Sequence, residues 1–288
     1  MMPIVKIAII GLGLIGGSAG KGIRRSGDLG IRVIGVPRRE ETIGLAIKLG
    51  AIDEGTTDLV AGVKDADIVF ICTPISLIIP TLKRIAPHLK SGAIVTDVGS
   101  SKEQIVAQAE KIMPKGTFFV GGHPMAGKEQ VKLEAADACL FKGKAWILTP
   151  TAKTSPKAVL LISNLIKLLG GKIMKMNPKT HDLVVAGISH VPLVVAAALV
   201  NAIAGEKQNK QKMKECASSG FRDTTRIASG DPQLGVDMFT TNKKAVLTML
   251  SAFKKSLSRL EKNIKAGNSN AIEGEMKKAK AFRDAIFS

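Results

Sequence analysis

Short apolar runs alternate with helix-like stretches through the first half of the chain. The runs are rich in β-branched residues and are bounded by turn residues, and a helix is expected over about residues 75–89. They predict strands at residues 5–10, 31–36, 67–72, 93–97, 117–121, 145–149 and 172–176. Strands separated by helices are typical of a doubly wound, mostly parallel sheet, which binds ligands at the carboxyl ends of its strands.

The pattern changes after Asn177 and Pro178. The strand signals stop there, and the remainder of the chain to Ser288 has the periodicity of helices. We therefore expect two domains, an α/β domain over residues 1–176 and an all-helical domain over residues 177–288. A chain of 288 residues is long enough for each domain to bury a core of its own.

One segment of the helical half, residues 183–205, contains no charged residue. A run of that length is able to span a bilayer. A helix that is apolar on all sides is equally expected at the centre of a helical dimer. His190, Pro192 and Asn201 lie inside the segment, and no second hydrophobic segment accompanies it. We therefore expect a homodimer built on the helical domain, and no membrane span.

The turn between the first strand and the following helix carries a glycine motif. It consists of Gly11, Leu12, Gly13, Leu14, Ile15 and Gly16, in the spacing G-x-G-x-x-G. Gly11 permits the tight turn, Gly13 lets the backbone approach a pyrophosphate, and Gly16 lets helix and strand pack closely. The helix then directs free N–H groups at the phosphates. These six residues predict a Rossmann-like domain that binds a dinucleotide cofactor.

The end of the second strand indicates which dinucleotide is bound. An NAD site usually places an acidic residue there, about 20 residues past the glycines, to bind the ribose hydroxyls. This chain has Arg38 and Arg39 at that position, and Glu40 is displaced into the next helix. A carboxylate at this position would repel the 2′-phosphate of NADP, whereas two guanidinium groups can bind it through charge-assisted hydrogen bonds. We therefore expect NADP in preference to NAD.

The overall charge is strongly basic, with 42 Lys and Arg against 24 Asp and Glu and a formal net charge of +18. The charge is spread along the chain and aromatic residues make up only 3%, so specific binding of nucleic acid is not expected. Cys72, Cys139 and Cys216 are far apart, which argues against disulfides and against a metal site. With no room for a leader before the first strand, we expect a cytoplasmic protein.

Candidate chemical groups lie in loops that follow the predicted strands or interrupt the helices. His123 follows two glycines at a strand end and is the best candidate for a base, with Ser100 on a neighbouring loop placed to fix its tautomer. Arg226 lies in a polar segment of the helical half, where it pairs with Asp223 or with a substrate carboxylate. His181, beside Asp182, is expected to have a structural role at a helix start.

These motifs together resemble the prephenate and arogenate dehydrogenases of tyrosine biosynthesis. The similarity runs nearly end to end, through residues 11–17, 72–74, 96–102, 121–127, 189–192 and 220–228. It implies NADP-dependent oxidative decarboxylation of a small anionic cyclohexadienol, in which His123 takes the hydroxyl proton and Ser100 orients His123. It further implies that the substrate is bound by Arg226, His190 and Glu129, and the cofactor by Thr73, Pro74 and Ser100.

Several alternatives stay open at this point. Arg38, Arg39 and residues 231–235 are most similar to arogenate dehydrogenases of cyanobacterial type, whereas Lys128 adds positive charge that favours the more anionic prephenate. Gly235 stands where other members have tryptophan. Other NADP-dependent 3-hydroxyacid dehydrogenases have a lysine in a central helix, which residues 183–205 lack. A non-enzymatic NADP sensor or nucleic-acid binder is the remaining alternative.

Overall fold

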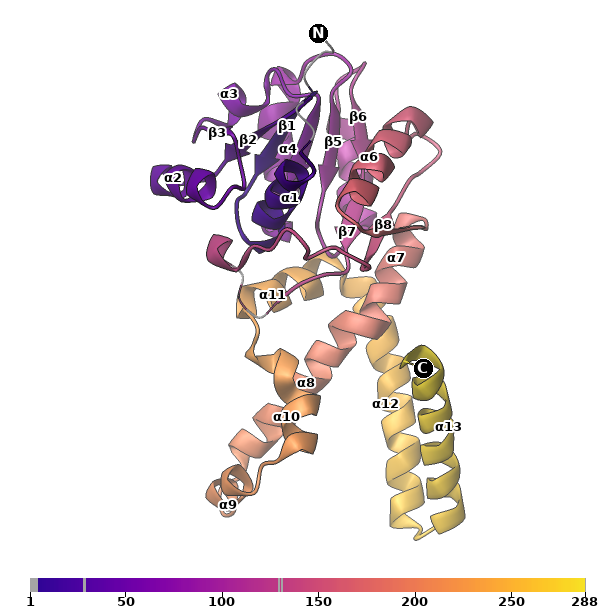
Figure 1. Cartoon of the computed structure of the whole chain (residues 1–288). Coiled ribbons are helices and arrows are strands. Elements are labelled where there is room, and N and C mark those ends of the chain that lie inside the picture. The colour runs from indigo at the N-terminus through magenta and orange to yellow at the C-terminus, as the bar shows by residue number, and fades with distance from the viewer. Residues whose placement is uncertain (1–4, 28–29, 129, 131, 288) are drawn as a thin grey trace.

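The computed structural model describes residues 5–27, 30–128, 130 and 132–287. Its first half contains a six-stranded parallel sheet in the order β3-β2-β1-β4-β5-β6 (Figure 1). The strands are β1 (Val5–Ile10), β2 (Ile31–Val36), β3 (Glu54–Gly55), β4 (Ile68–Ile71), β5 (Ile94–Asp97) and β6 (Phe118–Val120). The order reverses between β1 and β4, so the crevice for a ligand lies beyond these two strands. The predicted Rossmann-like fold is confirmed.

Alternating side chains of the strands pack into two separate hydrophobic cores, one on each face of the sheet. Ile7 and Ile9 pack on one face and Ala8 and Ile10 on the other, as the two-residue period of a strand requires. The first face is covered by α1 (Leu14–Arg25), α2 (Glu40–Lys48) and α6 (Pro156–Leu168). The second is covered by α3 (Leu59–Val63), α4 (Ile75–Ile85) and α5 (Glu103–Ile112).

The last two predicted strands do not join the main sheet, which corrects the sequence interpretation. They are β8 (Ala145–Leu148) and β9 (Lys172–Lys175), which form a second, three-stranded sheet with β7 (Gly122–Pro124). Gly121 alone separates β6 from β7, and a Cβ on Gly122 would lie only 2.8 Å from the carbonyl oxygen of Asp97. The close crossing of the chain over the end of β5 therefore requires glycine.

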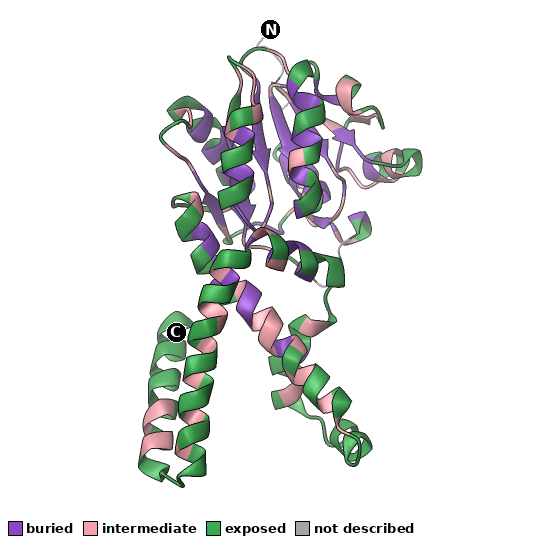
Figure 2. Cartoon of the chain, turned by 180° about the vertical axis from the view of Figure 1, so that it is seen from behind, coloured by how far each residue is buried: buried purple, intermediate pink, exposed green. Residues whose placement is uncertain are grey.

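The described part of the second half is helical. Its elements are α7 (Pro178–Val185), a π-helical turn (Ala186–His190), α8 (Val191–Gly205), α9 (Lys210–Glu215), α10 (Ser219–Thr225), a 3-10 turn (Arg226–Ser229), α11 (Pro232–Thr241), α12 (Lys243–Lys265) and α13 (Ser269–Phe287). Figure 1 shows two legs below the sheet, one formed by α8 to α10 and the other by α12 and α13. Both legs are largely exposed, whereas the strands are buried (Figure 2).

Two helices join the legs to the carboxyl ends of the strands. α11 packs against α4, where the Asp237 carboxylate accepts hydrogen bonds from Ser76 N (3.1 Å) and Ser76 Oγ (2.9 Å). α7 packs against α5. The continuous helix Pro178–Gly205 is, by length and composition, able to cross a membrane, and 28% of its apolar window is buried. The core helix of a soluble protein passes the same test of length and composition, so this finding alone does not indicate a membrane.

Candidate active site

The turn between β1 and α1 leaves no room for side chains. Gly11 has a φ of +91°, and a Cβ there would lie 2.7 Å from the carbonyl oxygen of Cys72. A Cβ on Gly16 would lie 2.1 Å from the carbonyl oxygen of Gly11. Gly13 directly precedes α1, and the first backbone N–H groups of that helix have no side-chain cap among the described residues. A tight turn followed by free N–H groups fits the pyrophosphate of a dinucleotide.

The other residues predicted at the cofactor site fall into two groups. Leu12 and Leu14 are buried in the core beneath the turn, so only their backbone is available to a cofactor. Arg38 and Arg39 are exposed at the end of β2, with Arg39 Nε 3.2 Å from Glu41 Oε1. The end of β2 therefore carries two exposed guanidinium groups, and the acidic residues Glu40 and Glu41 follow them in α2.

Two hydroxyl groups at neighbouring strand ends are buried without a hydrogen-bond partner among the described residues. They are Thr73 Oγ1, which follows β4, and Ser100 Oγ, which follows β5. Buried hydroxyls in native proteins are normally paired. Because ligands bind at this edge of a doubly wound sheet, both groups fit contacts to a bound molecule.

His123 lies on β7 and is only 8% exposed, so it belongs to a strand and not to the loop expected from the sequence. Its Nδ1 is 2.8 Å from His181 Nε2, and His181 Nδ1 is 2.8 Å from Asp182 Oδ1. The Asp182 carboxylate also accepts the backbone N–H groups of Lys102 (2.7 Å) and Glu103 (2.9 Å), at the start of α5. A chain of hydrogen bonds therefore runs from α5 through α7 to His123.

The donors and acceptors along these hydrogen bonds determine the tautomers of His123 and His181. A carboxylate only accepts hydrogen bonds, so Nδ1 of His181 carries the proton and its Nε2 is an acceptor. Nδ1 of His123 must then donate to His181, which leaves Nε2 of His123 with a free lone pair. The arrangement makes His123 Nε2 a proton acceptor.

A third histidine, His190, provides an N–H donor and is connected to Asp182 through Asn242. Asn242 Nδ2 donates to the Asp182 carbonyl oxygen (2.8 Å) and lies 3.2 Å from His190 Nδ1, so that nitrogen is the acceptor and Nε2 carries the proton. His190 Nε2 is buried and has no partner among the described residues. Burial lowers the pKa of His190 to about 4, and burial together with His181, Lys102 and His190 holds the pKa of His123 well below 6.5. Both rings are therefore neutral at pH 7.

Three predicted residues are not brought into this group by the structure. Ser100 does not orient His123, because His181 occupies that role. Arg226 lies in a turn that packs against α8 and α10, in the leg below the sheet (Figure 1). Glu129 lies outside the described residues.

Sequence reasoning gave His181 and Asp182 only a structural role at a helix start and missed their hydrogen bonds toward His123. The only signal in the sequence was a histidine followed directly by an aspartate.

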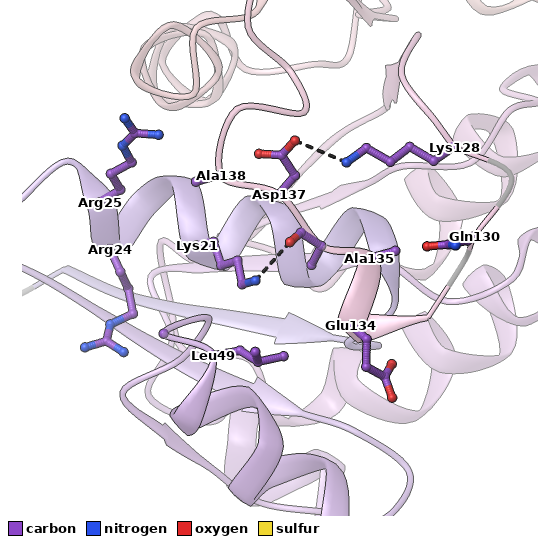
Figure 3. Close-up of a pocket in the computed structure, with 12 residues that line it drawn as sticks. Lys21, Arg24, Arg25, Leu49, Lys128, Gln130, Glu134, Ala135, Asp137 and Ala138 are labelled. Carbon is purple, nitrogen blue, oxygen red and sulfur yellow. Dashed lines mark hydrogen bonds and ion pairs between the residues drawn. The ribbon is translucent and has the colours of Figure 1, made fainter.

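A groove of about 720 Å³ lies elsewhere, along the flank of α1 (Figure 3). Its basic side chains are already engaged, since Lys21 Nζ donates to the Ala136 carbonyl oxygen (2.9 Å) and Lys128 Nζ lies 3.1 Å from Asp137 Oδ2. Lys128 is therefore paired with Asp137 in this groove, and the carboxylate offsets part of its charge.

Comparison with known proteins identifies the family. The models for the prephenate dehydrogenase nucleotide-binding and dimerization domains match residues 19–175 and 177–278. A prephenate dehydrogenase of Bacillus subtilis is 35% identical over 97% of this chain and 76% of its own length. The structure of Synechocystis arogenate dehydrogenase is 38% identical with a TM-score of 0.84, over 98% of this chain and 100% of that one. That of Aquifex aeolicus prephenate dehydrogenase, in complex with hydroxyphenyl propionate and NAD+, is 36% identical with a TM-score of 0.92, over 99% of both chains. The chain therefore belongs to the prephenate dehydrogenase family.

Proposed function

We propose that the chain catalyses the NADP-dependent oxidative decarboxylation of prephenate, arogenate or both in tyrosine biosynthesis. The observation that carries the proposal is His123, whose free Nε2 lone pair is fixed by His181 and Asp182 at the carboxyl ends of the strands. Family membership supports the reaction class. The NAD+ in the Aquifex aeolicus structure supports a nicotinamide cofactor. The choice of NADP depends on Arg38 and Arg39.

The proposed reaction needs one base and little else from the protein. When bound, NADP takes the hydride from the ring carbon that bears the substrate hydroxyl. His123 Nε2 accepts the hydroxyl proton as that carbon becomes a ketone. Carbon dioxide leaves from the opposite ring carbon, the remaining electron pair makes the ring aromatic, and His123 returns the proton to the phenolate oxygen. Since aromatisation drives the reaction, the protein mainly positions its reactants and stabilises charge.

The remaining groups are proposed to bind the reactants. His190 Nε2–H donates to the substrate from the helical half, while Thr73 Oγ1 and Ser100 Oγ face the nicotinamide end of the cofactor. Arg226 binds a substrate carboxylate, as the family resemblance implies. Glu129 is proposed to balance charge at the mouth of the site.

Turnover assays test this function directly. We expect reduced nicotinamide to form with prephenate or arogenate, and measurement with both substrates and both cofactors defines the preferences. A small 3-hydroxy acid serves as the competing substrate class. Turnover of that acid alone contradicts the proposed reaction. No turnover of any of them, with salt-sensitive retention on heparin, favours a nucleic-acid binder instead.

We predict that replacing Arg38 and Arg39 by alanine weakens NADP binding much more than NAD binding. Each guanidinium lost from a 2′-phosphate is expected to raise the Kd for NADP by roughly tenfold to a hundredfold. Fluorescence titration with each cofactor measures both constants.

Lys48→Ala is the matched control, because this lysine is exposed at the other end of α2. An equal loss of affinity for NAD and NADP in the arginine variants contradicts a role in selecting the cofactor.

We further propose a homodimer formed by the helical domain, which the dimerization-domain match supports. Large apolar side chains are exposed along both legs, including Met213 (39%) on α9 and Leu257 (53%) and Ile264 (64%) on α12. Apolar surface on this scale usually marks a protein interface. We predict that light scattering reports a dimer and that Leu257→Asp shifts the chain toward monomer at micromolar concentration.

Leu160→Asp is the control for this prediction, because Leu160 is similarly exposed (59%) but lies on α6, away from the legs. A soluble monomer of the unsubstituted chain contradicts the proposed dimer.

The domain boundary and the location of the protein are also proposed. We place the boundary between residues 176 and 177, within the connection from β9 to α7, and the interval between the two family-model matches supports it. We propose that the protein is cytoplasmic, which is consistent with its three free cysteines.

A further inference from the structure

Lys102 is a fully buried lysine that the reaction described above does not use. Both Lys102 and Asp97 are 0% exposed, and Lys102 Nζ forms an ion pair with Asp97 Oδ2. Burial lowers the pKa of Lys102, while the paired Asp97 carboxylate opposes this shift by favouring the ammonium form. A Cβ on Gly121, two residues before His123, would lie 3.6 Å from Lys102 Cδ, so the lysine side chain passes close to the segment that carries the proposed base. Burying a charge pair is costly, so the pair needs a reason beyond stability.

The pair is connected to His123 on both sides. Asp97 accepts hydrogen bonds from Gly99 N (2.9 Å) and from Gly122 N (3.3 Å), the residue before His123. The backbone N–H of Lys102 donates to Asp182, which orients His181 and through it His123. The position of His123 is therefore fixed from β5 by Asp97 and from α7 by Asp182.

We propose that Lys102 is a positioning residue that keeps His123 unprotonated, so that the base remains competent below neutral pH. The groups that face His123 are His181 and Asp182 from α7, His190 from the π-helical turn, and Lys102 with Asp97 from β5 and the loop that follows it. Lys102 is the only described cation among them when the histidines are neutral. Its charge opposes formation of an imidazolium at His123. The same cation contributes to the low pKa of His123.

Lys102 is not itself the proton acceptor in this proposal. Its ammonium group is held by the Asp97 carboxylate, and an ammonium group has no free lone pair. This distinguishes it from the lysine bases of 3-hydroxyacid dehydrogenases. The proposal depends on the proposed function only in taking His123 as the base.

The test is the pH dependence of Lys102→Met. Loss of the cation is expected to move the acid limb of the kcat/KM profile to higher pH, so that activity on that limb falls roughly three- to tenfold more than at the plateau. Lys111→Met is the matched control, since Lys111 is exposed at the other end of α5. A fall at all pH values without movement of the limb indicates a structural role, and loss of the plateau indicates that Lys102 is the base. Either result overturns the proposal.

A second variant and a second measurement separate this inference from the proposed function. The double variant Asp97→Asn, Lys102→Met removes both charges, so its acid limb should lie between those of the parent and of Lys102→Met. NMR titration of the histidine rings, with His123→Asn used to assign the His123 signal, should give the same order without any turnover. If no substrate is turned over but the order holds, the proposed function fails and the role of Lys102 stands. If the three titrations coincide, the role of Lys102 is wrong.

Discussion

Replacing His123 by asparagine is expected to lower kcat by roughly 10²- to 10⁴-fold, the usual contribution of a positioned base. Asparagine keeps a side-chain group that can bond to His181, but it cannot accept the hydroxyl proton. Cofactor and substrate binding should change little, because the glycine turn and Arg226 are untouched. Steady-state kinetics and separate binding titrations measure the two effects.

The pH profile of the parent enzyme adds a second readout of the same residue. Only neutral His123 accepts a proton, so activity should fall as the pH drops through its pKa. Because burial and His181 lower that pKa, the fall should come below the usual histidine range. His88→Asn is the control, because His88 is exposed in the 3-10 turn (Ala86–His88) that follows α4. Near-normal kcat in His123→Asn removes this histidine from the mechanism.

The sequence was sufficient for features that depend on local geometry. The glycine motif is one of them, because the Cβ contacts at Gly11 and Gly16 leave no alternative residue at those positions. The alternation of strands and helices also predicted a doubly wound, mostly parallel sheet and five of its six strands, whereas β3 was not predicted. Its six-stranded sheet follows from rules of connection and handedness that hold for most folds of this class.

Features that depend on contacts between residues far apart in the sequence could not be predicted from local patterns. β7 has only three residues, and it pairs with β8 from a segment more than twenty residues away, so no local pattern marked His123 as part of a strand. The same limitation applied to Ser100, which lies near the site but does not bond to His123. The partner of His123 comes instead from α7, 58 positions further along the chain.

In the proposed mechanism, the hydrogen-bond chain makes the helical half part of the chemistry. α7 supplies His181 and Asp182, and Asp182 is held by backbone N–H groups at the start of α5. Movement of the helical half relative to the sheet would therefore disturb the tautomer of His123 as well as the substrate pocket. Asp237 makes a second such contact, to Ser76 at the start of α4.

The hydrogen-bond chain leads to the second large prediction, for Asp182→Asn. Asp182 Oδ1 accepts both the Lys102 N–H and the His181 Nδ1–H, while Oδ2 accepts the Glu103 N–H. An amide has a single oxygen acceptor, which keeps two of these three bonds at the Oδ1 position, so its NH₂ group faces the Glu103 N–H as donor against donor. The tautomer of His181 is then retained, but the negative charge beside it is lost. The imidazolium that forms when His123 accepts a proton therefore loses the charge that stabilises it through His181.

We therefore expect Asp182→Asn to lower kcat by roughly tenfold to 100-fold with little change in KM, because the carboxylate that stabilises the imidazolium formed during proton transfer is lost. Asp237→Asn is the matched control, because Asp237 also joins the two halves but contacts no histidine. It should leave kcat within a fewfold of the parent. Equal losses in the two variants would show that Asp182 acts only by holding the halves together, whereas a loss confined to Asp182→Asn assigns it to stabilising the protonated base.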